Sequence, residues 1–364
     1  MGVPKEIKDQ EGRVGITPAG VSTLIAQGHE VNIETGAGIY AGFSNEQYSD
    51  AGARLVSASD AWQCELVVKV KEPLPSEYVF LDQQMVFTFF HLAGVDPNLT
   101  TTLLSNGTTA IAYETLTDQQ GRLPLLAPMS AIAGNMSALV GNYYLAKFNG
   151  GKGVQLGNVL GKRHGKVVVV GDGIVGQHAA KTASGMGANV FIAGIDTEHM
   201  ANLKSHALAD AEFFLSTPEN LTAHLQDTDL LIGAVLARGA HAPKLISDAM
   251  IGTMQPGSVA VDVSIDQGGC FSSSKPTSHS APVFVKHDVI HYCVTNMPGA
   301  YPRTATLALM DATLPYIVKI ANAGKSRLLQ DAELLSAINT FDGRLTLKPV
   351  AEALNRLADY QPFE

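Results

Sequence analysis

Two basic residues near the start of the sequence are of types that bind anions. Lys71 follows the apolar run 66–70, and ligand clefts of α/β sheets form where strands end. Lys69 lies in the same run, and two cations at a strand end could hold a carboxylate; Arg13 also stands where the flanking sequence is unlike a plain solvated face. The alternative is that Lys71 forms a surface ion pair with Glu72.

Two further residues are of types that move protons. His91 ends the apolar run 87–90, where an imidazole could exchange protons near neutral pH; it could equally be a structural histidine. Asp266 follows the run 259–263 and precedes two glycines, which places it in a loop after a strand. Asp266 is therefore either a proton-handling group or a turn residue that caps the glycine loop.

A glycine turn directly follows the four valines 167–170. The motif Gly171-Asp172-Gly173-Ile174-Val175-Gly176 is GxGxxG between a predicted strand and a predicted helix. In that context the first glycine allows the tight turn, the second lets the backbone approach a pyrophosphate, and the third lets the helix pack on the strand. The motif indicates a dinucleotide site, and the alternative is a glycine-rich turn without a ligand.

An acid is expected about 20 residues further on, to bind the adenosine ribose. Asp196 lies at about that distance, although the strand itself should end at Ala193-Gly194. Asp196 is thus a candidate ribose ligand or an ordinary helix N-cap. No arginine stands nearby to favour a 2′-phosphate, so we expect NAD rather than NADP.

These residues are set among short apolar runs that alternate with helical patterns, which predicts an α/β protein. The expected strands are 31–33, 66–70, 85–90, 109–113, 167–170, 190–192, 230–232, 259–263 and 292–294, and the expected helices are 18–27, 130–147, 174–186 and 304–323.

The order of these elements predicts two Rossmann-like domains. A discontinuous substrate domain of residues 1–128 and 304–364 should contain the first four strands. A doubly wound, parallel-sheet dinucleotide-binding domain of residues 129–303 should be inserted in it.

The composition excludes several classes of protein. The net charge is −9 and the sequence has no run of basic residues, so we expect no nucleic-acid-binding surface. Three distant cysteines form no CxxC pair, so neither a disulfide framework nor a bound metal is expected. There is neither an apolar run of membrane-spanning length nor an N-terminal signal pattern. We expect a cytoplasmic protein with small-molecule partners.

Several stretches resemble the alanine dehydrogenase family along nearly the whole chain. They are Arg13-Val14-Gly15-Ile16-Thr17-Pro18, Val68-Lys69-Val70-Lys71-Glu72-Pro73, Phe87-Thr88-Phe89-Phe90-His91-Leu92-Ala93, Ala112-Tyr113-Glu114-Thr115, Leu123-Pro124-Leu125-Leu126-Ala127-Pro128-Met129-Ser130, Ile265-Asp266-Gln267-Gly268-Gly269-Cys270 and Asn296-Met297-Pro298.

The resemblance implies a homo-oligomer, commonly a hexamer, that uses NAD to convert L-alanine reversibly into pyruvate and ammonia. It implies that Arg13 and Lys71 hold the substrate carboxylate and that His91 and Asp266 handle protons. The other implied substrate-binding residues are Met129 and Asn296, and the implied cofactor-binding residues are Ser130, Gly171, Gly173, Ile174, Val175, Gly176, Asp196, Ser216, Val235, Leu236, Val263, Asp266 and Met297.

The sequence departs from the family pattern near the cofactor. The ribose-binding acid of the family falls on Gly194, and a nearby lysine falls on His199. Two alternatives therefore stay open: an NADP-using or cofactor-degenerate relative, and the NAD(H)-binding component of a proton-translocating transhydrogenase. The joint presence of Arg13, Lys71 and His91 argues against the transhydrogenase component, which needs no amino-acid proton chemistry.

Overall fold

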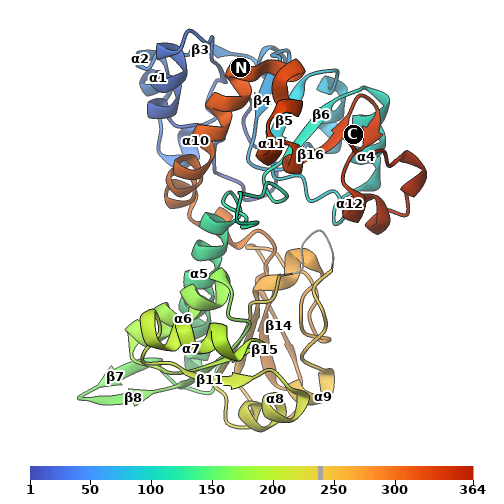
Figure 1. Cartoon of the computed structure of the whole chain (residues 1–364). Helices are drawn as coiled ribbons and strands as arrows, with labels where there is room; N and C mark the ends of the chain where they lie inside the picture. The colour runs from blue at the N-terminus through green and yellow to red at the C-terminus, as the bar shows by residue number, and fades with distance from the viewer. Residues whose placement is uncertain (237–240, 364) are drawn as a thin grey trace. The chain divides into compact units, whose positions relative to one another are not determined.

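The computed structural model describes residues 1–236 and 241–363. They form two compact units, each with its own β-sheet and flanking helices (Figure 1). The first unit comprises Met1–Met129 and the segment from Gly299 onward, and the second comprises the described residues between Ser130 and Pro298. The second unit is thus inserted in the sequence of the first.

The first unit contains an eight-stranded sheet in the order β17-β16-β6-β5-β4-β1-β2-β3. Strands β1 to β6 are parallel, and β16 and β17 extend the sheet in antiparallel fashion beyond β6. The order of the parallel strands reverses between β1 and β4, which in such sheets marks where ligands bind. The strands are β1 Gly2–Val3, β2 Asn32–Glu34, β3 Arg54–Val56, β4 Leu66–Val68, β5 Met85–Thr88, β6 Thr109–Ala112, β16 Ile338–Phe341 and β17 Arg344–Leu345.

The helices of the first unit begin and end at recognisable signals. Helix α1 starts with Pro18 after the N-cap Thr17, whose side chain accepts a hydrogen bond from the backbone of Gly20. Helix α10 is interrupted at Gly324, where φ is 63°. The helices are α1 Pro18–Ala26, α2 Asn45–Asp50, α3 Ala58–Trp62, α4 Pro97–Ser105, α10 Pro302–Arg327, α11 Ala332–Ala337 and α12 Lys348–Ala353.

The second unit contains a seven-stranded sheet in the order β11-β10-β9-β12-β13-β15-β14, in which only β14 is antiparallel to its neighbour. This is the Rossmann strand order, and its reversal lies between β9 and β12. The strands are β9 Lys166–Val170, β10 Asn189–Gly194, β11 Glu212–Leu215, β12 Leu230–Gly233, β13 Val259–Asp262, β14 Val283–Lys286 and β15 Val289–Tyr292.

Helices cover both faces of this sheet. Val167 and Val169 of β9 belong to one apolar cluster, and Val168 and Val170 belong to another. The predicted central strand, buried on both faces, is confirmed. The helices are α5 Ala127–Leu145, α6 Ile174–Met186, α7 Thr197–His206, α8 Pro218–Leu225 and α9 Asp248–Ile251, and a separate hairpin is formed by β7 Gly157–Val159 and β8 Lys162–His164.

The prediction of two Rossmann-like α/β domains is confirmed, but most predicted strands end at other residues, as three examples show. The strand predicted over 85–90 ends at Thr88, because the N–H groups of Phe90 and His91 bond to a side chain instead of a neighbouring strand. The strand predicted over 259–263 ends at Asp262, whose side chain caps a 3-10 helix over Val263–Gln267. The strand predicted over 292–294 is Val289–Tyr292.

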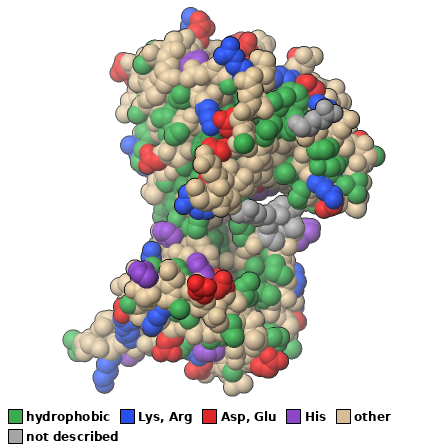
Figure 2. Space-filling model, viewed as in Figure 1, with side chains coloured by type: hydrophobic (Ala, Val, Ile, Leu, Met, Phe, Trp, Pro, Cys, Tyr) green, Lys and Arg blue, Asp and Glu red, His purple; other side chains and the backbone are tan. Residues whose placement is uncertain are grey.

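Among the described residues, no helix is long and apolar enough to span a membrane. Acidic and basic side chains are interspersed on the face shown in Figure 2, without a large patch of one sign.

Candidate active site

Arg13 and Lys71 are both buried in the first unit, at the carboxyl ends of β1 and β4 where the strand order reverses. The alternative of a surface ion pair between Lys71 and Glu72 is wrong, because both side chains are buried. Glu72 accepts a hydrogen bond from Lys8, with 2.6 Å between Nζ and Oε1. The first unit thus has two buried cations at the carboxyl edge of its sheet, which is the usual place for an anionic ligand.

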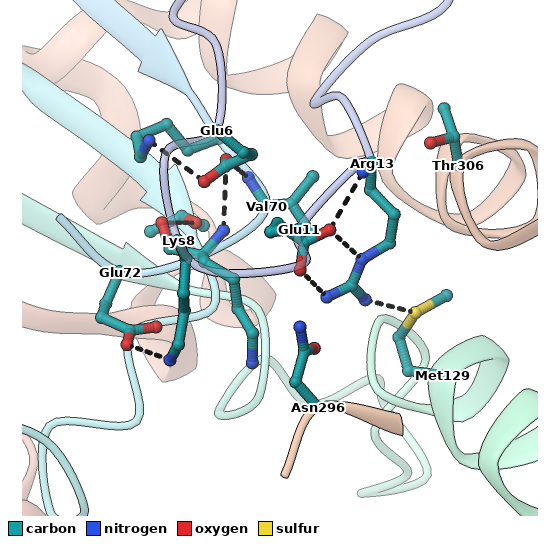
Figure 3. A network of polar contacts seen from close by, with 12 residues as sticks. Glu6, Lys8, Glu11, Arg13, Val70, Glu72, Met129, Asn296 and Thr306 are labelled. Atoms are coloured by element: carbon teal, nitrogen blue, oxygen red, sulfur yellow. Dashed lines mark hydrogen bonds and ion pairs between the residues drawn. The ribbon is translucent and has the colours of Figure 1, made fainter. Parts of the chain in front are cut away.

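Glu11 fixes the orientation of Arg13 (Figure 3). The Arg13 Nε lies 2.7 Å from Glu11 Oε1, and Nη2 bonds to Oε2, so the pair is bidentate. Nη1 lies 3.0 Å from the sulfur of Met129. The sequence analysis assigned no role to Glu11, because nothing local distinguishes it from a surface acid.

A second buried carboxylate, that of Glu6, holds the backbone at Lys71, and Figure 3 shows its contact with the neighbouring Val70. Glu6 Oε1 accepts hydrogen bonds from the backbone N–H groups of Val70 at 2.6 Å and Lys71 at 3.3 Å. The other oxygen of Glu6 lies 3.2 Å from Lys69 Nζ, which also contacts Glu77 at 2.9 Å. Burial raises the pKa of Glu6 against the opposing effect of Lys69. This network anchors the loop that follows β4.

His91 is half-buried and has a left-handed backbone, with a φ of 48°. Its ring stacks on Phe89, with 5.6 Å between the ring centroids. Burial, together with the smaller effects of the nearby cations Lys71, Lys8 and Arg13, lowers the pKa of His91 to about 3. The imidazole is therefore neutral at neutral pH and able to accept a proton.

Glu114 holds the backbone on both sides of this turn. Its Oε1 accepts the N–H of His91 at 2.6 Å and its Oε2 accepts the N–H of Phe90 at 3.2 Å. Burial raises the pKa of Glu114 to about 7, although these backbone donors and Lys71 act to lower it. Glu114 lay within a stretch that the sequence analysis matched to the family, but it was given no role there.

The glycine turn of the second unit has the geometry that a dinucleotide requires. Gly171 has a φ of 109°, and a Cβ atom there would lie 2.5 Å from the carbonyl oxygen of Ala234. A Cβ at Gly176 would lie 1.9 Å from the carbonyl oxygen of Gly171. A Cβ at Gly173 would meet nothing within 4 Å, so this backbone is open to a ligand. The turn therefore fits a bound pyrophosphate, with the N–H groups at the start of α6 as donors.

The other predicted cofactor residues of the second unit follow neighbouring strands of its sheet. Ser216 follows β11, and its N–H donates to the carbonyl oxygen of Gly194 at 2.8 Å. Val235 follows β12, where it exchanges hydrogen bonds with the Ser264 hydroxyl. Leu236 is exposed, Val263 is half-buried, Met297 is buried, and Ser130 is half-buried on α5.

Asp196 is the N-cap of α7. Its Oδ1 accepts the N–H groups of Glu198 at 2.9 Å and His199 at 3.0 Å, and the side chain is otherwise exposed. Asp196 therefore caps α7, and its role as a ribose ligand stays a prediction.

Asp266 and Asn296 lie together at the ends of β13 and β15. The N–H of Asn296 points at both carboxylate oxygens of Asp266, at 3.3 and 3.4 Å. Asn296 has a φ of 60°, a conformation that asparagine tolerates better than most residues. Asp266 is exposed and lies in the 3-10 helix rather than in an irregular loop.

The residue that organises the glycine loop after β13 is Asp262, which the sequence analysis missed. Its buried carboxylate accepts the N–H groups of Ser264 at 3.1 Å, Cys270 at 2.9 Å and Phe271 at 3.1 Å, and the hydroxyl of Ser274 at 2.6 Å. Burial raises the pKa of Asp262 despite these donors. The only sequence signal was an acid within an otherwise apolar run.

The Rossmann unit has an open glycine turn, and the first unit has two buried cations and a neutral, half-buried histidine at its strand ends; together they define a nicotinamide-dependent oxidoreductase. Comparison with known proteins shows to which family within this class the chain belongs. Residues 2–133 match the N-terminal domain of the alanine dehydrogenase/PNT family, and residues 137–348 match its C-terminal domain. The chain belongs to the alanine dehydrogenase family.

Individual relatives agree with this assignment. Alanine dehydrogenase of Bacillus subtilis (strain 168) is 47% identical, over 100% of this chain and 96% of that protein. The enzyme of Mycolicibacterium smegmatis is 45% identical over 98% of this chain and 96% of its own. A solved structure of L-alanine dehydrogenase matches with a TM-score of 0.92 and 48% identity, covering 98% of this chain and 99% of the other. A transhydrogenase from Sinorhizobium meliloti shares the fold, with a TM-score of 0.80 and 22% identity over 95% and 98% of the two chains.

Proposed function

We propose that this protein catalyses the reversible oxidative deamination of L-alanine with NAD. In the forward direction L-alanine, NAD⁺ and water give pyruvate, ammonium, NADH and a proton. The observation that carries the proposal is that Arg13, Lys71 and a neutral His91 lie at the strand ends of one unit, in a chain 47% identical to an alanine dehydrogenase.

Arg13 and Lys71 bind the substrate carboxylate. Glu11 bonds to the Nε and Nη2 atoms of Arg13 and fixes the direction of the guanidinium, while Nη1 lies beside Met129. Met129 and Asn296 are the further substrate-binding residues, with the sulfur of Met129 as an apolar wall for a small side chain. An apolar pocket discriminates one methylene by only about 1–3 kcal/mol, so serine or 2-aminobutyrate are expected minor substrates.

His91 and Asp266 handle protons. After hydride leaves Cα, the substrate is an iminium ion; His91 takes a proton from the water that attacks it and later returns a proton to the leaving nitrogen. Binding of the substrate carboxylate offsets the cations that hold the pKa of His91 low, and this shifts the pKa towards neutrality. Asp266 stabilises the positive charge on the substrate nitrogen.

NAD is the proposed cofactor, and it supplies the hydride acceptor when bound. The glycines of the turn let the backbone approach the pyrophosphate, and the N–H groups at the start of α6 bind it. The proposed cofactor-binding residues are Ser130, Gly171, Gly173, Ile174, Val175, Gly176, Ser216, Val235, Leu236, Val263, Asp266 and Met297. We also propose that the protein is cytoplasmic and forms a homo-oligomer, which the family resemblance implies is a hexamer. Light scattering would measure the number of subunits.

The test is reduction of NAD by the purified protein with L-alanine at alkaline pH. The proposal expects turnover with NAD, and it expects His91→Ala to reduce kcat by about 10²–10⁴-fold while the Kd for NADH stays the same. A protein that binds NADH but reduces neither NAD nor NADP with alanine would be a nucleotide-binding component instead, as in a transhydrogenase.

A further inference from the structure

The second strand of the nucleotide unit ends without an acid of its own. In this fold a carboxylate at that point normally binds the adenosine ribose. Here β10 ends at Gly194, which is buried beside the glycine turn: the N–H of Gly171 donates to the carbonyl oxygen of Ala193 at 2.9 Å. The position that would supply the ribose ligand therefore lacks a side chain.

The carboxylate of Asp172 fills the space that a side chain at position 194 would take. A Cβ atom added at Gly194 would lie 2.6 Å from Asp172 Oδ2 and 2.6 Å from the sulfur of Met200. Both distances are far shorter than a non-bonded contact allows. Asp172 is the second residue of the glycine turn, so an acid reaches this point from the turn rather than from the strand end.

Asp172 Oδ2 is buried and has no hydrogen-bond partner among the described residues. Helix α6 begins at Ile174, and its N-cap is Gly173, which provides no side-chain cap. A buried carboxylate oxygen without a donor destabilises a protein, so its retention indicates that a ligand supplies the donor. Asp172 as a whole is half-buried.

A second polar atom without a partner lies at the same place. The Ser216 hydroxyl is buried and unbonded among the described residues, while its backbone N–H bonds to the carbonyl oxygen of Gly194. An acceptor and a hydroxyl thus flank Gly194 from two different loops. Asp196, in contrast, is exposed and already caps α7 through Oδ1.

We propose that Asp172 takes the place of the missing acid and accepts hydrogen bonds from the adenosine ribose hydroxyls of the nicotinamide dinucleotide, with the Ser216 hydroxyl beside it. A carboxylate at this point repels a 2′-phosphate, so Asp172 also selects NAD over NADP. The proposal rests on the nicotinamide cofactor of the proposed function, but not on alanine as the substrate.

Calorimetric titration of the full-length protein with NADH and with NADPH tests the proposal. Asp172→Asn should raise the Kd for NADH about 10–100-fold, which is the usual effect of losing a hydrogen bond to a charged group. It should also reduce the ratio of the Kd for NADPH to the Kd for NADH. Asp196→Asn should leave the Kd for NADH unchanged, because asparagine caps a helix as well as aspartate does. Glu219→Gln, at an exposed acid of the same unit, is the matched control.

Moving the acid gives the sharpest comparison. Asp172→Gly alone should weaken NADH binding, and Gly194→Asp alone should weaken it too, because the new side chain collides with Asp172. The double variant Asp172→Gly/Gly194→Asp should recover the wild-type Kd to within about threefold, since it returns the acid to the strand end and leaves only the flexible Met200 side chain to move aside. Unfolding temperatures without nucleotide identify any variant that fails to fold.

Three results would overturn the proposal: a loss of NADH affinity in Asp196→Asn but not in Asp172→Asn, no change in either, or no recovery in the folded double variant. A wild-type protein that binds neither nucleotide would end both this inference and the proposed function. NADH binding that depends on Asp172, without alanine turnover, would refute only the substrate.

Discussion

The Glu114 carboxylate accepts the backbone N–H of His91 at 2.6 Å, and His91 has a φ of 48°. A left-handed backbone at a residue other than glycine costs of order 1–3 kcal/mol and persists only where neighbouring groups hold it. Glu114 is therefore the positioning residue that sets the direction of the imidazole.

The first prediction concerns that positioning role. Glu114→Gln replaces one acceptor oxygen by an NH₂ group, which leaves a backbone N–H without an acceptor and lets the turn relax. We expect kcat to fall about 10–100-fold while the Kd for NADH is unchanged, because a small displacement of a catalytic group is costly. Steady-state kinetics across pH measure this, with Glu65→Gln at an exposed position as the control. An unaltered kcat and pH profile would remove Glu114 from the catalytic arrangement.

The raised pKa of Glu114 predicts how the stability of the protein depends on pH. In the unfolded chain this carboxyl titrates near 4.5 and in the folded protein at about 7. The folded state binds the proton more tightly, so the protonated Glu114 stabilises the folded protein by at most about 3 kcal/mol. This contribution is complete below pH 4.5 and is lost as the pH rises through 7. The free energy of unfolding of Glu114→Gln should therefore increase relative to that of the wild type as the pH rises from 4.5 to 7, because glutamine does not titrate. Denaturant titrations at several pH values would show a constant difference if the pKa were not raised.

The buried network around Lys69 predicts a strongly non-additive response to mutation. Lys69→Met leaves Glu6 and Glu77 buried without their cation, and we expect it to lower the free energy of unfolding by about 3–5 kcal/mol. The triple variant Glu6→Gln/Lys69→Met/Glu77→Gln should recover most of this loss, because no unpaired charge remains buried. Chemical denaturation measures both. A triple variant no more stable than the single one would show that the charges contribute net stability.

The position of Arg13 predicts that its replacement weakens substrate binding and leaves cofactor binding unchanged. Arg13→Lys removes the bidentate contact with Glu11 and the Nη1 donor beside Met129. We expect the KM for pyruvate to rise about 10–100-fold, as for a lost charge-assisted hydrogen bond. The Kd for NADH should stay within about twofold of wild type, because Arg13 and the glycine turn belong to different units. Equal losses in both constants would point to misfolding instead of a role in substrate binding.

The sequence by itself determined the class of fold and the types of residue at the strand ends. Apolar runs, helix signals and the glycine turn are local patterns, so they identified the α/β units, the buried strand 167–170 and the candidates Lys71 and His91. The identity of Asp196 as an N-cap was also readable as an alternative, because capping depends on only a few neighbouring residues.

Only the tertiary structure decided which carboxylates hold the candidates in place. Glu114 meets His91 because β5 and β6 pair in a register that sets Thr88 opposite Ala112, and Asp172 reaches Gly194 because β9 and β10 are neighbours. Glu6 bonds to the loop after β4 because β1 pairs with β4. Each contact joins residues about 20 or more positions apart, and such contacts depend on strand order and register, which local patterns do not encode.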